Sequence, residues 1–238
     1  MSSKTSAPRS YPFVIANAFT QDVFGGNPAA IVFLDPSDSD TLTQEERQKF
    51  AKGFSQPIIV FLTPTSTSTG AVVSFDVQYF TPTDEVRLCG HGTVAAIKVI
   101  LDSATNSPGF GQGTRFPSFA ASETHTAEFT TVGGTVISAR KVVIPDEVGG
   151  EGEDWFEVVL PGGKLQKLPA EEEERVLGII NRAVGKELQV KYIGIGEPPF
   201  HQDLLIVLDE SENIEQLKID TQALVGIEFG LRSSIYGD

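Results

Sequence analysis

The chain has 238 residues, of which 40% are hydrophobic and 21% charged, a composition typical of a folded globular protein. Its formal net charge of −14 argues against nucleic acid and anionic membranes as partners, because both select basic clusters. We expect no transmembrane helix and no secretory signal, because no apolar run is long enough and residues 1–10 are polar. The single cysteine, Cys89, excludes an internal disulfide and a cysteine-rich zinc site. A cytoplasmic location is therefore expected.

The first part of the chain predicts strands interrupted by two helices. Residues 1–10 are expected to form a disordered tail. Short apolar or alternating runs predict strands over residues 11–19, 29–34, 57–62 and 71–80, with a breaker-rich turn at 24–28. Thr43 and Glu46 have the spacing of a capping box, which predicts a helix that Gly53 ends. After Thr93, residues 94–101 are apolar except for Lys98, which predicts a buried helix over residues 93–101 surrounded by strands.

The second part continues in the same mixed style. Residues 102–122 form a long connection rich in glycine, proline and serine. Strands are predicted over residues 127–131, 135–143, 155–160, 190–195 and 204–208, and helices over 170–184 and 213–225. Because the helices do not alternate regularly with strands, the chain is expected to have an α+β fold.

The segment Leu88-Cys89-Gly90-His91-Gly92-Thr93 is the most informative for chemistry. It places a thiol, an imidazole and a hydroxyl at the start of the buried helix, where backbone N–H groups have no partner within the helix. Such a helix start favours a carboxylate or an enolate oxygen. The alternative is structural: the two glycines form a tight turn and His91 is a hydrogen-bonded polar residue.

This segment and the turn Phe24-Gly25-Gly26-Asn27-Pro28 together resemble the PhzC/PhzF family of phenazine biosynthesis. The resemblance rests on FGGNPAAIVFLD at residues 24–35 and FTPTDEVRLCGHGTVAA at residues 80–96. It implies the diaminopimelate epimerase-like fold, with two similar halves that each wrap strands around a central helix. The halves are expected at residues 11–125, with central helix 93–101, and at residues 126–238, the second being incomplete.

The resemblance also implies an isomerase that uses neither a metal nor a coenzyme, with its site in the cleft between the halves. This sequence departs from the family pattern at Ser55-Gln56-Pro57, where the family usually has Ser-Glu-Thr with a proton-shuttling glutamate. Gln56 cannot transfer a proton, because an amide does not titrate usefully. The acidic family motif EDPxTGS does not occur in the sequence, and a central helix for the second half is also missing.

Several side chains could carry the proton. His91 is the first candidate, because an ordinary imidazole titrates near neutrality. Cys89 is the second, because a thiol at a helix start can be activated, although a lone cysteine is more often inert. Gln56 and Asn27 are expected to hydrogen-bond the substrate, and Gly90, Gly92 and Thr93 to bind its anionic group. The remaining titratable candidates are His125, His201, Asp84 and Glu85, each of which is more often a solvated surface residue.

Two hypotheses from different classes follow. In the first, the protein is an isomerase or epimerase that moves a proton on a small carboxylate or carbonyl metabolite. In the second, it is an inactive relative that acts as a binding or dimerisation module, with a homodimer covering exposed apolar surface. The expected partner in the first hypothesis is a small-molecule substrate.

Overall fold

The computed structural model describes residues 10–20, 22, 24–38, 42–65, 72–106, 126–142, 155–196 and 204–224. The chain divides into two compact units, residues 1–161 and residues 162–238. The expected tail over most of residues 1–10, most of the connection at 102–122, His125 and His201 lie outside the described residues.

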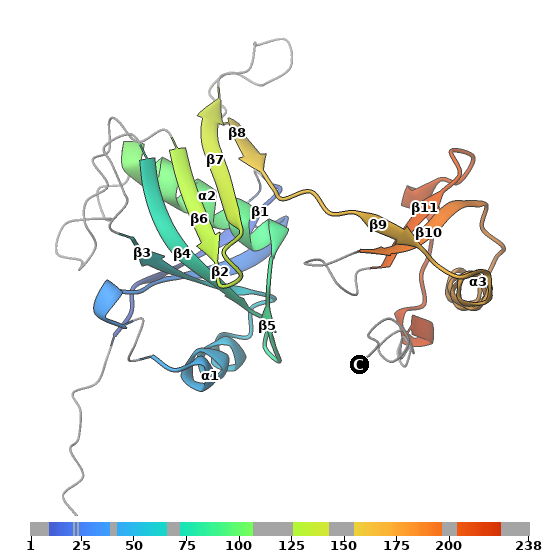
Figure 1. Cartoon of the computed structure of the whole chain (residues 1–238), viewed down its shortest axis with the longest axis horizontal. Helices are drawn as coiled ribbons and strands as arrows, with labels where there is room; N and C mark the ends of the chain where they lie inside the picture. The colour runs from blue at the N-terminus through green and yellow to red at the C-terminus, as the bar shows by residue number, and fades with distance from the viewer. Residues whose placement is uncertain are drawn as a thin grey trace, which may run out of the picture. The chain divides into compact units, whose positions relative to one another are not determined.

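The first unit contains one curled sheet (Figure 1). Its strands follow the order β1-β2-β3-β4-β6-β7-β8, and β5 pairs with β4 beside that path. Most pairs are antiparallel, but β2 pairs with β3, and β4 with β6, in parallel. The strands are β1 (Phe13–Ala18), β2 (Asn27–Phe33), β3 (Ile59–Pro64), β4 (Val72–Phe80), β5 (Glu85–Val86), β6 (Thr126–Thr131), β7 (Val136–Val142) and β8 (Trp155–Val159).

The two faces of this sheet bury different sets of side chains. Ile31 and Phe33 pack in the core cluster that contains helix α2, whereas the alternate residues Ala30 and Val32 pack in the cluster that contains α1. All four are essentially inaccessible to water, which explains why β2 is a continuous apolar run. Each large aliphatic or aromatic side chain buried in this way contributes about 1.5–3 kcal/mol to folding.

Helix α2 (Gly90–Asn106) lies along the inside of the curled sheet (Figure 1). The prediction of a buried helix over residues 93–101 is confirmed, and the helix extends beyond both expected ends. Ala96, Ile97 and Leu101 are at most 1% exposed. Lys98 is exposed and lies with its Nζ 5.6 Å from the ring centroid of Phe156, a cation–π contact.

Helix α1 (Gln44–Phe54) covers the other face of the sheet. The predicted capping box is present: the Glu46 N–H donates to the Thr43 hydroxyl, and the Thr43 N–H donates to the Glu46 carboxylate over 2.8 Å. The helix continues through Gly53, contrary to the sequence prediction. It ends instead at Ser55, which adopts the left-handed conformation with φ of 54°.

Strands β6, β7 and β8 belong to the same sheet as β1–β4. Strand β6 pairs with β4, and β7 and β8 extend the sheet from it. The expected boundary after residue 125 therefore falls within the first unit, and the division between the compact units follows Pro161. The long connection at residues 102–122 favours a boundary between halves near residue 126. The length of a connection does not reveal, however, which strands pair with one another.

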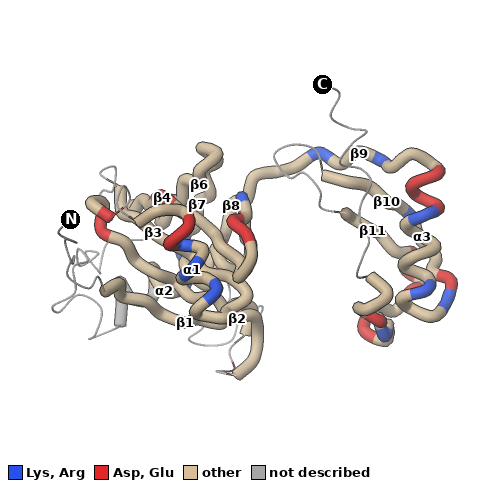
Figure 2. Tube along the Cα trace, turned by 90° about the horizontal axis from the view of Figure 1, so that it is seen from below, with Lys and Arg blue, Asp and Glu red and all other residues tan. Residues whose placement is uncertain are grey.

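The second unit is a small sheet with one helix. Its strands, in the order β11-β10-β9, are β9 (Leu165–Lys167), β10 (Val190–Gly196) and β11 (Leu204–Leu208). Helix α3 (Ala170–Val184) packs Val176 against Ile193 and Ile195 of β10, which confirms the predicted helix. Figure 2 shows that acidic residues occupy the start of α3, where the helix dipole favours negative charge. The part of this unit that the structure describes contains no counterpart of α2.

The predicted last helix over residues 213–225 is wrong. The structure has two short 3₁₀ turns instead, η2 (Ile214–Gln216) and η3 (Thr221–Leu224). The Asn213 side chain accepts from the Glu215 N–H, and the Asp220 side chain accepts from the Gln222 N–H. Such local bonds satisfy the backbone outside an α-helix and so compete with it. Across the described residues, no helix combines the length and apolarity that a membrane crossing requires.

Candidate active site

Three segments that are distant in the sequence meet at one end of the first unit's sheet. This end, where β2 and β3 begin, is called the edge below. Strands β2 and β3 are parallel and begin at the same edge, where the Ala30 N–H donates to the Ile58 carbonyl over 3.1 Å. The first turn of α2 packs onto this edge, because a Cβ on Gly92 would lie 3.2 Å from Cγ2 of Ile58. Asn27, Gln56 and His91 are located just before or at the start of these three elements.

The turn between β1 and β2 requires glycine at one position. Gly26 has φ of +73°, and a Cβ there would lie 2.3 Å from the carbonyl oxygen of Ala18. This close approach places Asn27 directly opposite Ala18 in the β1–β2 pair. The GGN sequence therefore has a structural role, which is to deliver Asn27 and Pro28 to the start of β2.

Cys89 and His91 are titratable side chains that lie close together at the start of α2. The Cys89 Sγ lies 3.3 Å from the His91 Nδ1. Burial raises the pKa of the Cys89 thiol, and hydrogen bonds from the backbone N–H groups of Gly92 and His91 oppose this rise. The thiol is therefore neutral near pH 7 and is a weak base. Two N–H groups that were expected to bind an anion are directed at the sulfur atom.

The His91 ring is partly buried, and this burial lowers its pKa. The Pro28 backbone opposes the effect; because proline has no N–H, its carbonyl must be the interacting group. The Nε2 atom is shielded from water and makes no hydrogen bond of good geometry within the described structure. A ring that is neutral at pH 7 retains one nitrogen that can accept a proton, which is the requirement for a general base.

Thr93 holds the start of the helix together. It is only 1% exposed, and its hydroxyl donates to the Cys89 carbonyl over 2.8 Å. The Thr93 Oγ1 also lies 2.6 Å from the phenolic oxygen of Tyr79 on β4. Thr93 was expected to bind the substrate, but this geometry gives its hydroxyl an internal role instead. Sequence reasoning missed Tyr79, because no local pattern links a strand residue to a helix start.

The other predicted residues differ in burial. Gln56 is half-buried, Asn27 and Gly90 are exposed, and Gly92 is buried against β3. A Cβ on Gly90 would meet no atom within 4 Å, so the fold does not demand glycine there. The roles of Gln56, Asn27, Gly90 and Gly92 toward a substrate stay predictions.

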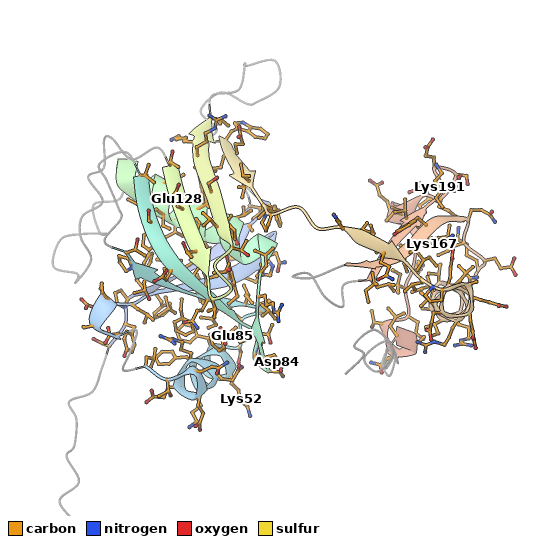
Figure 3. The ribbon with its side chains drawn as sticks, viewed as in Figure 1. Lys52, Asp84, Glu85, Glu128, Lys167 and Lys191 are labelled. Atoms are coloured by element: carbon orange, nitrogen blue, oxygen red, sulfur yellow. The ribbon has the colours of Figure 1, made fainter. Side chains whose placement is uncertain are left out.

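Glu85, one of the remaining titratable candidates, has hydrogen-bond partners other than His91. Its carboxylate accepts from the side-chain amides of Gln44 (2.6 Å) and Gln78 (3.1 Å), so it ties α1 to the sheet. Figure 3 shows Glu85 and the exposed Asp84 close to α1. Within the described part of the chain, no group of three or more His, Cys, Asp or Glu side chains could hold a metal ion.

Comparison with known proteins gives consistent results. A family model described as phenazine biosynthesis-like protein, PhzC-PhzF, matches residues 16–230. A human phenazine biosynthesis-like domain-containing protein is 28% identical over 222 residues, which cover 91% of this chain and 64% of the human protein. An uncharacterized isomerase of Deinococcus radiodurans is 41% identical over 86 residues, or 36% of this chain and 25% of that protein.

A solved structure shows the same fold. The PhzF-family phenazine biosynthesis protein of Bacillus anthracis superposes with a TM-score of 0.58 at 22% identity, over 89% of this chain and 60% of that chain. The present chain thus spans a little under two thirds of the length of the human relative and of this solved structure. The expectation of an α+β, epimerase-like fold is confirmed, and the chain belongs to the PhzC-PhzF family of phenazine biosynthesis-like proteins.

Proposed function

We propose that the chain provides the proton-transfer site of an isomerase that acts on a small carboxylate or carbonyl metabolite. The observation that carries this proposal is the Cys89–His91 pair, 3.3 Å apart at the first turn of α2. Family membership and a relative named as an isomerase support the reaction class. The substrate remains defined only by its chemistry, as a molecule with an acidic C–H beside a carboxylate or carbonyl.

In this proposal His91 is the general base. Its neutral ring accepts a proton from the carbon beside the carboxylate or carbonyl, and the electron pair of the broken C–H bond moves onto the oxygen as an enolate. The partial positive charge at the start of α2 stabilises that oxygen. The imidazolium then returns the proton to another carbon on the same face of the substrate, which completes the isomerisation with no net change in atoms or electrons.

Gln56 and Asn27 have supporting roles in this proposal. Asn27 begins β2 and Gln56 precedes β3, and these two parallel strands begin at the edge onto which the first turn of α2 packs. Their amide groups can donate hydrogen bonds to substrate oxygens or accept them from hydroxyl and ammonium groups. Neither can replace His91 as the proton carrier.

The test uses the purified chain in D₂O with a panel of small hydroxy- and amino-carboxylates. Deuterium incorporation next to the carboxylate, followed by mass spectrometry, is expected for the productive compounds and should disappear in His91→Ala. The control is Lys191→Ala, which changes an exposed lysine of the second unit and should keep the wild-type rate. Deuterium incorporation that is equal in the wild type and His91→Ala would overturn the assignment.

The second candidate is a binding module without catalysis. It is favoured by one observation, the amide of Gln56 at the position where the family usually has a glutamate. The same panel discriminates the two functions. A compound that raises the melting temperature but incorporates no deuterium supports the binding module.

A further inference from the structure

Tyr79 is a buried polar residue that the proposed mechanism does not use. It lies on β4 in the core cluster around α2 and is 1% exposed. A hydroxyl in such an apolar environment is costly unless it has a hydrogen-bond partner. Its partner is the Thr93 hydroxyl, at 2.6 Å.

The direction of this hydrogen bond follows from the next one. Thr93 has a single hydroxyl hydrogen, and it donates this hydrogen to the Cys89 carbonyl over 2.8 Å. The Thr93 oxygen must therefore accept, and Tyr79 must donate. The Thr93 N–H also donates to the Cys89 carbonyl, over 2.9 Å. The backbone of Cys89 is thus fixed by two bonds from Thr93, whose side chain is in turn held by Tyr79.

We propose that Tyr79 is a positioning residue for the candidate site: acting through Thr93, it fixes the Cys89 backbone and so holds the thiol beside the His91 ring. This inference deepens the proposed function and rests on the same site. It assigns the strand β4 a part in the site.

The hydrogen bonds from Tyr79 to Thr93 and from Thr93 to the Cys89 carbonyl, called the relay below, affect the Cys89 thiol. The Cys89 sulfur accepts from the backbone N–H groups of His91 and Gly92, and these bonds favour the thiolate. They depend on the alignment of the first helical turn, which the relay maintains. The ionisable groups with which the structure shows an interaction of Cys89 are His91, on α2, and Tyr79 itself. Tyr79 stays neutral, because burial raises its pKa strongly.

The test measures the reactivity of Cys89 rather than turnover. Because Cys89 is the only cysteine of the 238-residue chain, alkylation by iodoacetamide reports on this thiol alone. The rate is followed as a function of pH, and the midpoint gives the apparent pKa of the thiol. If the wild-type chain incorporates no deuterium into any compound, the proposed function is refuted. The alkylation of Cys89 still tests the positioning role of Tyr79 in that case.

Tyr79→Phe is the main variant. Phenylalanine keeps the ring and therefore the burial of the site, so the loss of N–H alignment dominates and the midpoint should rise by about half a pH unit. Thr93→Val should produce a similar rise, and the double variant should add little, because the two residues act in one relay. Thr93→Ser retains the hydroxyl and should stay near the wild-type midpoint.

Tyr11→Phe is the matched control. The Tyr11 hydroxyl is also buried, but it makes no hydrogen bond within the described structure, and its ring packs with the α1 cluster on the other face of the sheet. Its midpoint should equal that of the wild type. A Tyr79→Phe midpoint that equals both would overturn the proposal. If Tyr79→Phe does not fold, equal midpoints for Thr93→Val and Thr93→Ser would overturn it as well.

Discussion

The backbone of Gly92 lies directly against the side chain of Val60: a Cβ on residue 92 would be 3.0 Å from the Val60 Cγ2. The first turn of α2 therefore packs its backbone against the Val60 side chain of β3, with no side chain of residue 92 between them. This contact sets the position of Cys89 and His91 relative to Gln56, which comes just before β3. Gly92, the second glycine of the CGHG sequence, thus has a packing role in addition to any contact with a substrate.

Gly92→Ala should destabilise the fold. The added methyl group must push Val60 or Ile58 aside, and overpacking of this kind typically costs about 1–3 kcal/mol. Urea unfolding should show a correspondingly lower midpoint. Gly90→Ala is the control, because its Cβ meets no atom within 4 Å, and it should be neutral or slightly stabilising. Equal unfolding midpoints for the two variants would contradict the packing role of Gly92.

Much of the fold could be predicted from the sequence, because the signals are local. The apolar run at residues 93–101 predicts a buried helix, and Thr43 with Glu46 predicts a capped helix start; both are confirmed. The division between units and the turns after Asn213 could not be predicted. They depend on the pairing of β6 with β4 and on side-chain bonds to the backbone, neither of which leaves a periodic pattern.

The candidate site was only partly predictable. The sequence identified Cys89 and His91, and the structure places them 3.3 Å apart. It did not identify Tyr79, which is 14 residues from Thr93 and on a different element. It also assigned Thr93 to the substrate, because an exposed and a buried threonine at a helix start look identical in sequence.

His91 should titrate below the ordinary histidine pKa of 6.5, because burial lowers its pKa. Between the lowered midpoint and 6.5, the unfolded chain binds a proton that the folded chain does not. The free energy of unfolding therefore rises with pH through this window, and the contribution of His91 is lost on acidification. The measurement is NMR of the three histidines, with His91 identified by the signal that disappears in His91→Gln. A midpoint at or above 6.5 would show that the ring is not desolvated.

Thr43→Ala should destabilise α1. The change removes the hydroxyl that accepts from the Glu46 N–H, and loss of such a cap typically costs about 1 kcal/mol. Chemical denaturation of the chain measures this loss. Thr43→Ser preserves the acceptor and serves as the control, with unfolding expected close to the wild type. A Thr43→Ala protein as stable as Thr43→Ser would mean that the capping box contributes nothing.

Gln56→Glu should increase proton transfer. The substitution places a titratable carboxyl, half-buried, beside the edge where α2 begins, and a general acid or base in position typically contributes about 100-fold or more to the rate. The readout is deuterium incorporation into the carboxylates that bind the wild-type chain. Gln166→Glu, an exposed position on β9 of the second unit, introduces the same charge without the same surroundings and should leave the rate unchanged. If Gln56→Glu is no faster than Gln166→Glu, then position 56 does not face the reacting carbon, and His91 must act without a partner from the segment before β3.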